Sequence, residues 1–515
     1  MHFSRLKIFL QNHWVLLIIL MVAFLLRTMQ ITQPLIDIFS WRQSSTAMMA
    51  ENFYKLDWNI FYPQVNWTGP GTGYQGREFQ TITYLAAIGY KIFGQHDYIG
   101  RIIAVAFGMW GLIALYNLVL LVWDKRHALA GTAMMAIIPG SVLIDRSFLP
   151  DPVMVSLTTT CMWLFVLYLQ KDRSIYLWLA AAAGCLGILT KIPGMIIAFP
   201  MTYALVSFFK QQGELHYAKI KPILFAAILV LIPVTAYYLW ARHLSMNYPP
   251  YHFAGSGNWI WNNWKIYIQE KYFLSKMKEV FEFWLLGFPA IYLFILGLLF
   301  LPPQNKSNNS PGLKWFFHFM LLGCLFYYFI GGRELVRNPW NFHLFLPVIS
   351  VFCGRSLIIL FSYNHLSTKQ IFIPIALVFL LILWNNVRML KQRLFFDPGA
   401  AQGYLMGKEL KALKQPGELV ITLPHNIGDP VAIYYSGGKG FLFPPAYKWA
   451  PTELPKEDEE CIAILEDLRS QGADWFGIVD KHFQEISNNR PAFKKYLDNN
   501  MKMVKQTNDF ILYKW

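Results

Sequence analysis

The sequence predicts an α-helical protein that crosses a membrane many times and carries a small α/β domain at its C-terminal end. Three observations predict this fold. Of the 515 residues, 55% are hydrophobic and only 15% are charged, whereas soluble domains carry about 25% charged residues. The aromatic content of 17% is typical of a chain that meets many lipid–water boundaries. Long apolar runs fill the chain up to about residue 390, and the pattern changes after it.

The apolar runs predict about eleven membrane spans. A bilayer core of about 30 Å requires about 20 apolar residues in a helix. No small-residue cleavage site follows the first run, so we expect that run to remain as a span. The runs are 13–30, 98–122, 128–144, 151–169, 175–190, 192–209, 220–241, 283–301, 315–331, 342–361 and 371–387.

Lysine and arginine residues are divided unevenly between the connectors. The N-terminal tail and connectors such as 123–127 and 170–174 are rich in them, whereas the short connectors of the alternate set hold few. Because cytoplasmic connectors carry the positive excess, we expect a cytoplasmic N-terminus and an extracytoplasmic C-terminal domain. Short loops and the lack of an endoplasmic-reticulum retrieval tail favour a bacterial inner membrane.

The net charge of +15 has two interpretations, a topology signal in the connectors or a basic pocket for phosphate. The basic residues are dispersed and no nucleic-acid motif is present, so we expect no nucleic-acid partner. The five cysteines have no CxxC spacing, which predicts neither a zinc site nor a disulfide framework.

The expected outer loops are 31–97, 145–151, 242–280 and 331–341. In the first loop, Met49, Phe53 and Leu56 share one helical face, and the stretch 81–93 is similar. We expect both stretches to be short helices that lie in the membrane interface, with packed loop helices as the alternative.

The chain divides into a transmembrane domain, residues 1–390, and a C-terminal domain, residues 391–515. Within the second, 418–423 and 473–480 are typical of strands, 458–471 of a helix, and the last residues of a hairpin turned at Asn508. Alternating strands and helices predict a small α/β domain. The glycine-rich stretch 428–440 lacks both common nucleotide-binding patterns.

Ionisable residues at the ends of spans are costly to place there and often functional. Four separate loops place such residues on the expected outer face. They are Asp37, Arg77, Glu78, Asp145, Arg146, Asp151, Lys191, Arg333, Glu334, Arg337 and His343. Cations of this kind can hold a lipid phosphate, and a carboxylate opposite can take a proton from an attacking hydroxyl.

Structural interpretations of these residues stay open. Asp37 and Asp151 could each cap a helix, and Lys191 could extend to the lipid headgroups. Arg146 could pair only with Asp145, and Glu78 only with Arg77.

The combination resembles the GT-C superfamily of membrane glycosyltransferases. It is most similar to the bacterial relatives of the polyprenyl-phosphate-mannose protein mannosyltransferases and of the lipid A aminoarabinose transferase. The resemblance is carried by Asp37 after the first span, SWRQ with the downstream GREF, the second acid in RSFLPD, the lysine after the fifth span and NFHLFLPVISVFCG.

The resemblance implies roles for individual residues. Asp37 is the expected catalytic base and Asp151 is expected to assist or to orient the acceptor. Lys191, with Arg146 or Arg333, is expected to contact the donor phosphate. The remaining expected cavity residues are Arg42, Arg77, Glu78 and His343. Since Asp37 is followed by Ile38 and not by a second acid, we expect no metal or other cofactor, and transfer with inversion.

The predicted function is therefore transfer of a sugar from a polyprenyl-phosphate-linked donor to an acceptor hydroxyl outside the cytoplasm. The acceptor is a lipid, glycan or protein. The alternatives are a transporter or flippase of lipid-linked sugars and a polysaccharide polymerase. The nearly uncharged span interiors favour the enzyme, because transporters place ionisable residues near mid-bilayer.

Overall fold

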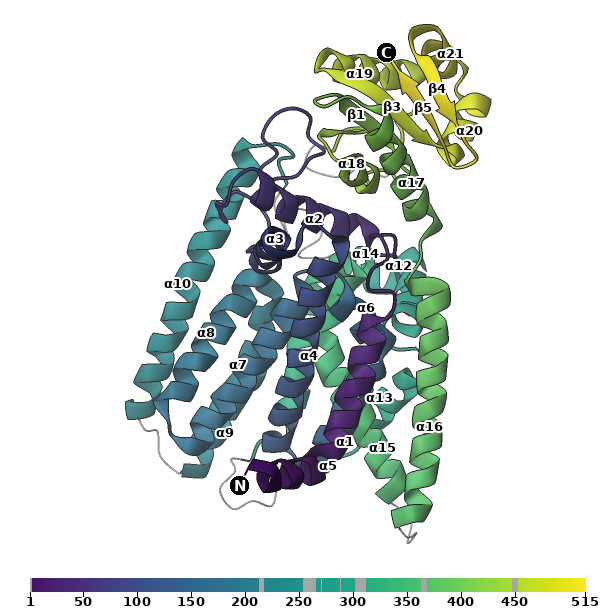
Figure 1. Cartoon of the computed structure of the whole chain (residues 1–515). Helices are drawn as coiled ribbons and strands as arrows, with labels where there is room; N and C mark the ends of the chain where they lie inside the picture. The colour runs from purple at the N-terminus through teal and green to yellow at the C-terminus, as the bar shows by residue number, and fades with distance from the viewer. Residues whose placement is uncertain are drawn as a thin grey trace.

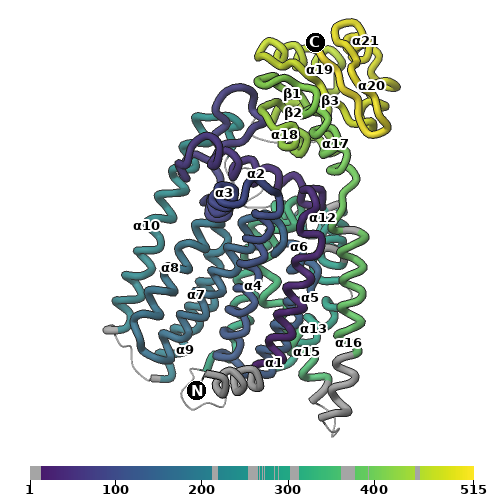
Figure 2. The backbone as a smooth tube through the Cα atoms, viewed as in Figure 1, coloured from purple at the N-terminus to yellow at the C-terminus, as the bar shows by residue number. Residues whose placement is uncertain are grey.

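The computed structural model describes residues 2–212, 217–252, 265–269, 271–287, 289–301, 312–362, 368–446 and 453–515. Long helices form a bundle, and the C-terminal α/β domain caps one end of it, opposite the N-terminus (Figure 1). The chain leaves the bundle at α16 (Thr368–Met389) and continues directly into the C-terminal domain (Figure 2).

Each predicted apolar run lies in or overlaps a helix of the bundle. The remaining helices are α1 (His2–Thr28), α4 (Asp97–Val122), α5 (Lys125–Ile137), α6 (Pro139–Arg146), α7 (Asp151–Lys171), α8 (Ser174–Thr190), α9 (Ala198–Gln212), α10 (Tyr217–Asn247), α13 (Ala290–Leu299), α14 (Phe316–Arg337) and α15 (Leu346–Ser362). Between predicted spans lie η1 (Ile192–Ile197), α11 (Ile266–Gln269), α12 (Lys271–Glu279) and η2 (Val280–Leu285), and η3 (Pro339–Phe345) leads into α15.

The number of spans is smaller by a strict criterion. In the described residues, six helices are long and apolar enough to cross a membrane, or seven if α5 and α6 form one span bent by 66°. The bend falls at Pro139, where the ring removes a backbone donor. Three more apolar helices are shorter, including His13–Thr28. The protein spans the membrane several times, and the predicted number of eleven is not established.

The two helices expected in the membrane interface differ. Both α2 (Ser40–Lys55) and α3 (Thr81–Phe93) lie at the end of the bundle that carries the C-terminal domain (Figure 1). On α3, Ile92 and Phe93 are 66% and 68% exposed, which fits a helix with an apolar face in the membrane interface. In α2, thirteen of sixteen residues are buried, so this helix is a packed element and not an interfacial one.

The C-terminal domain contains a five-stranded sheet with the order β2-β1-β3-β5-β4. Strand β1 pairs in parallel with β2 and with β3. Strand β5 pairs antiparallel with β3 and with β4. The strands are β1 (Leu419–Leu423), β2 (Gly440–Leu442), β3 (Ala473–Val479), β4 (Lys502–Gln506) and β5 (Phe510–Lys514). Its helices are α17 (Pro398–Leu413), α18 (Val431–Ser436), α19 (Asp458–Ser470), α20 (Asp480–Asn489) and α21 (Pro491–Asn500), and η4 (Leu390–Leu394) precedes them.

The predicted strands, helix and closing hairpin of this domain are all present. The glycine-rich stretch serves the backbone: Gly437 ends α18 in the left-handed region at φ +67°. A Cβ atom on Gly440 would lie 2.2 Å from the carbonyl oxygen of Val420. Gly437 is thus required at the end of α18 and Gly440 in the sheet, whatever the domain binds.

The C-terminal domain is held tightly against the first outer loop. The hydroxyl groups of Tyr434 and Tyr435 donate to the carboxylate of Asp97 at 2.8 and 2.6 Å. The Tyr435 oxygen also accepts from the backbone N–H of Leu35 at 2.7 Å. Backbone bonds join Gly440 to the loop at Asn66 and Gly69. One hydrophobic cluster includes residues of α2, α3 and the sheet, so the two regions share a core.

Candidate active site

A cavity of about 1220 Å³ lies where the bundle meets the C-terminal domain. Its wall includes the segment that enters α2, the loop before α3, η1, parts of α14 and η3, and loops of the C-terminal domain. Most of the wall is apolar, and charged side chains are set within it, as in sites for small ligands.

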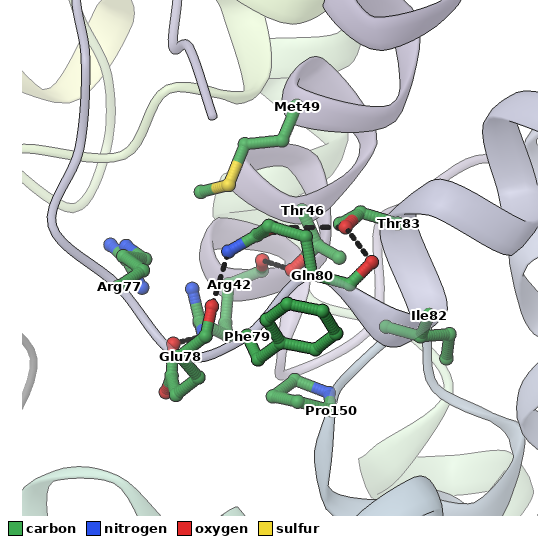
Figure 3. Close-up of a pocket in the computed structure, with 10 residues that line it drawn as sticks. All are labelled: Arg42, Thr46, Met49, Arg77, Glu78, Phe79, Gln80, Ile82, Thr83 and Pro150. Atoms are coloured by element: carbon green, nitrogen blue, oxygen red, sulfur yellow. Dashed lines mark hydrogen bonds and ion pairs between the residues drawn. The ribbon is translucent and has the colours of Figure 1, made fainter. Parts of the chain in front are cut away.

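Arg42 and Glu78 form an ion pair in the cavity wall. Their Nη2 and Oε2 atoms are 2.9 Å apart, and both side chains are largely buried. Burial acts to raise the pKa of Glu78, but the charges of Arg42 and Lys191 outweigh it and hold the pKa below its usual value. Figure 3 shows the pair in a small pocket beside the main cavity, with Met49 and Pro150 on either side. Glu78 is therefore an anion whose charge is already compensated.

Arg77 lies on one side of this pair (Figure 3) and lines both pockets. The proposed loop pairing of Arg77 with Glu78 does not form, because Glu78 pairs with Arg42. Arg77 is 8% exposed, and its buried Nε atom has no hydrogen-bond partner in the described structure. The Tyr237 hydroxyl donates to the backbone oxygen of Arg77 at 3.0 Å and fixes the loop. A buried guanidinium with spare donors is suited to an anionic ligand.

Lys191 and Asp151 form a second pair, 2.7 Å apart. Lys191 follows the last residue of α8 and lines the cavity, where its ammonium group also donates to Asn341. Asp151 is fully buried behind Lys191, makes no capping bond, and keeps Oδ2 without a partner among the described residues. The structure thus brings together two predicted residues from separate loops.

Asp37 lies outside the cavity wall in a buried cluster. Its Oδ1 atom accepts from the N–H of Phe39 at 3.0 Å and from the side chain of Gln43 at 2.6 Å. Its Oδ2 atom lies 3.4 Å from Arg101 and 3.6 Å from Arg146. Asp37 makes no cap on α2. These contacts are suited to hold the start of α2 in place, and the role of Asp37 as base stays a prediction.

Arg146 is part of the same cluster and does not line the cavity. Its guanidinium donates to the carbonyl oxygen of Gln30 at 3.0 Å and lies 4.1 Å from the centre of the Phe395 ring. The suggested pair with Asp145 does not form. Sequence reasoning missed Arg101, although a charged residue inside an apolar run was a signal for it.

His343 also lies outside the cavity, in a third buried cluster. Its Nε2 atom is 3.0 Å from Asp145, which is bonded on its other oxygen to Arg27 at 2.8 Å. Arg27 was missed as well, and it too is a charge near the end of an apolar run. This cluster joins α1, α6 and η3, which indicates a structural role.

The remaining predicted positions are divided. Arg333 is half-buried on α14 and does not line the cavity, whereas Glu334 does and accepts from Asn338 at 2.9 Å. His252 and Lys276 line the cavity from the predicted loop 242–280, of which residues 253–264 and 270 lie outside the described residues. The described residues contain no group of three or more side chains that could hold a metal ion.

Sequence reasoning missed one whole side of the cavity. The C-terminal domain contributes Asp397 and the segment 426–429 to the wall. Asp397 also caps α17 by accepting from the N–H groups of Gly399 and Ala400. The glycine-rich stretch 428–440 was the only local signal near them, and it did not indicate the cavity, because the tertiary structure alone brings these residues there.

Comparisons with known proteins agree with this architecture. A family model described as dolichyl-phosphate-mannose-protein mannosyltransferase matches residues 81–240. The structure is similar to apo ArnT from Cupriavidus metallidurans, with a TM-score of 0.64 and 12% identity over 98% of both chains. The chain therefore shares the fold of that structure. It is similar to ArnT bound to undecaprenyl phosphate as well, with a TM-score of 0.61, 12% identity and 98% coverage of both chains.

A third solved structure with a similar fold is an oligosaccharyltransferase from Archaeoglobus fulgidus, in complex with Zn and sulfate. It aligns with a TM-score of 0.55 and 13% identity over 92% of this chain and 70% of that chain. No curated protein sequence gives a significant match. The resemblance that the sequence predicts is confirmed at the level of the fold.

Proposed function

We propose that this protein is a glycosyltransferase that moves a sugar from a polyprenyl-phosphate-linked donor to an acceptor hydroxyl. One observation carries the proposal: a single cavity joins buried cations to an apolar wall beside the membrane-spanning helices. A lipid phosphate requires both, because its headgroup is anionic and its chain is apolar. The matching family model and the ArnT structure with undecaprenyl phosphate support the same class of donor.

The donor phosphate binds to Arg77 and Lys191, with Arg42 beside them. Arg77 has donors to spare, and Lys191 lines the cavity at the end of α8. Lys191 keeps the phosphate-binding role that the sequence predicted for it. Arg77 and Arg42 replace Arg146 or Arg333 in that role, because neither of those two lines the cavity. The lipid chain lies along apolar wall residues that include Met195, Phe199, Phe326 and Ile330.

The cations also act in the chemical step. The hydroxyl oxygen of the acceptor attacks the sugar carbon that bears the phosphate, and the bond from that carbon to the phosphate oxygen breaks. Negative charge then grows on the departing phosphate, and fixed cations in a desolvated site stabilise it. A single displacement inverts the sugar carbon and requires no metal ion. The reaction takes place at the outer face of a bacterial inner membrane.

Binding of undecaprenyl phosphate to the purified chain in nanodiscs tests the donor site. We expect Arg77→Gln to weaken binding by roughly 10- to 100-fold, since a hydrogen bond to a charged group contributes about 1.5–3 kcal/mol. Arg126→Gln is the matched control, because Arg126 is exposed at the start of α5 and does not line the cavity. Equal binding by both variants would contradict the proposed phosphate site.

Sugar transfer separates the enzyme from a transporter. The purified chain is incubated with labelled undecaprenyl-phosphate sugars and with membrane vesicles of its own organism as the source of acceptor. An enzyme produces labelled acceptor and releases undecaprenyl phosphate. Movement of the labelled donor across the bilayer with no new linkage would refute the proposed function in favour of a flippase.

A further inference from the structure

Asp429 has a conformation fixed by a tight turn in the C-terminal domain. The backbone N–H of Asp429 donates to the carbonyl oxygen of Asn426 at 3.0 Å, and Gly428 between them has φ +92°. A positive φ at the third position of a four-residue turn favours glycine. The Oδ1 atom of Asp429 accepts from the N–H of Val431 at 2.9 Å. The turn therefore leaves the other carboxylate oxygen, Oδ2, for a different partner.

Asp429 also belongs to the wall of the reaction cavity. Asp429 is 5% exposed and lines the cavity together with Asn426, Ile427 and Gly428. Its Oδ2 atom is 3.4 Å from the hydroxyl of Ser40, the first residue of α2 and itself a wall residue. This distance is long for a hydrogen bond that a hydroxyl group donates. Figure 1 shows α18, which follows the turn, close above α2.

The turn occupies the position in the sheet where α/β domains commonly bind ligands. It follows the carboxyl end of β1, whose next connection leads through α18 to β2 on one side. The neighbouring strand β3 connects onward to the hairpin on the other side. Loops at such a divergence form a crevice for ligands. The bonds of Tyr434 and Tyr435 to Asp97 hold this crevice against the bundle.

The charge around Asp429 differs from that around Glu78 and Asp151. Glu78 is paired with Arg42 and Asp151 with Lys191, whereas Asp429 makes no ion pair within the described parts of the chain. Burial, and then the charge of Asp397, raise the pKa of Asp429 to about 7, against the pull of the bonds from Val431 and Ser40. A carboxyl group of this kind can take up and release a proton near neutral pH.

We propose that Asp429, supplied by the C-terminal domain, binds the acceptor hydroxyl and takes its proton during sugar transfer. The inference rests on the proposed function. The hydroxyl donates to Oδ2 of Asp429, and its oxygen attacks the sugar carbon as the bond to the phosphate breaks. The proton passes to the carboxylate, and the electron pair of the broken bond leaves with the phosphate. The C-terminal domain thus provides a wall of the active site that faces the acceptor.

The test compares Asp429→Asn with the unaltered chain in two measurements. Asparagine keeps an oxygen for the Val431 N–H and lacks the carboxylate. The first measurement is the transfer of labelled sugar to membrane vesicles from undecaprenyl-phosphate donors that carry mannose, glucose or aminoarabinose. We expect the rate of transfer to fall by roughly 100-fold in Asp429→Asn. Binding of undecaprenyl phosphate is expected to stay within about 2-fold, because Asp429 is not a phosphate ligand. Asp467→Asn, an exposed position on α19, is the matched control.

Two outcomes would overturn the proposal. One is transfer by Asp429→Asn at more than half the rate of the unaltered chain. The other is an equal loss in Asp429→Asn and Asp429→Glu, since glutamate keeps a carboxyl group and a purely structural role would not distinguish the two. If the unaltered chain itself transfers no sugar and does not bind undecaprenyl phosphate, the proposed function fails, and that result is separate from either outcome.

Discussion

Asp37 and Asp429 are both buried carboxylates near the start of α2, but their surroundings differ. Asp37 is held by two arginines and two hydrogen bonds and does not line the cavity. Asp429 has one backbone bond, a long contact to Ser40 and a place in the cavity wall. Burial alone therefore does not mark a catalytic carboxylate. A fully compensated carboxylate stabilises structure, and an uncompensated one beside a cavity is available for chemistry.

The largest effect is expected for Asp37→Asn. The substitution leaves Arg101 and Arg146 buried without their anion, and breaking a buried ion pair by removing one partner costs about 3–5 kcal/mol. We therefore expect a clear fall in the thermal unfolding temperature of the purified chain in detergent. A variant with an unchanged unfolding temperature and no transfer activity would instead establish Asp37 as the base that the sequence predicted.

The pH dependence of stability should sharpen the description of Asp429. The pKa of Asp429 in the folded chain is about 7, above the usual value of 3.8 for an aspartate side chain. Its protonated form therefore stabilises the fold fully below pH 3.8, and that contribution is lost as the pH rises to about 7, by at most about 1.4 kcal/mol per pH unit. Asp429→Asn should remove this component. If the unfolding free energies of the two chains change in the same way between pH 5 and pH 8, this expectation is wrong.

The smallest effect is expected for Tyr435→Phe at the contact between the domains. The change removes the hydroxyl that bridges Asp97 and the backbone of Leu35, which costs about 1–3 kcal/mol because both hydrogen bonds are partly buried. We expect faster cleavage between the domains in limited proteolysis and lower transfer activity, with binding of undecaprenyl phosphate retained. Tyr404→Phe is the control, since the Tyr404 ring packs on Tyr435 and no hydrogen bond of its hydroxyl is found in the described structure.

Local sequence was enough to predict the apolar helices and most of the C-terminal elements. A run of about 20 apolar residues in lipid must satisfy its backbone internally, and a helix does so whatever its neighbours are. Local periodicity likewise determined β1, β3, α19 and the closing hairpin. It also marked Lys191, Asp151, Arg77 and Glu78, because charges beside apolar runs are conspicuous. The burial of α2 was not visible, since it depends on the domain that packs on it.

The tertiary structure alone decided which charges meet. The partners of Asp37 come from α4 and α6, and Ser40 meets a carboxylate 389 residues away in the chain. Local sequence limits the conformation of neighbouring residues, but it does not specify contacts between distant segments, which follow from packing of the whole core. For that reason the sequence indicated the kind of chemistry, and only the fold separated the carboxylates that hold the structure together from those that face the cavity.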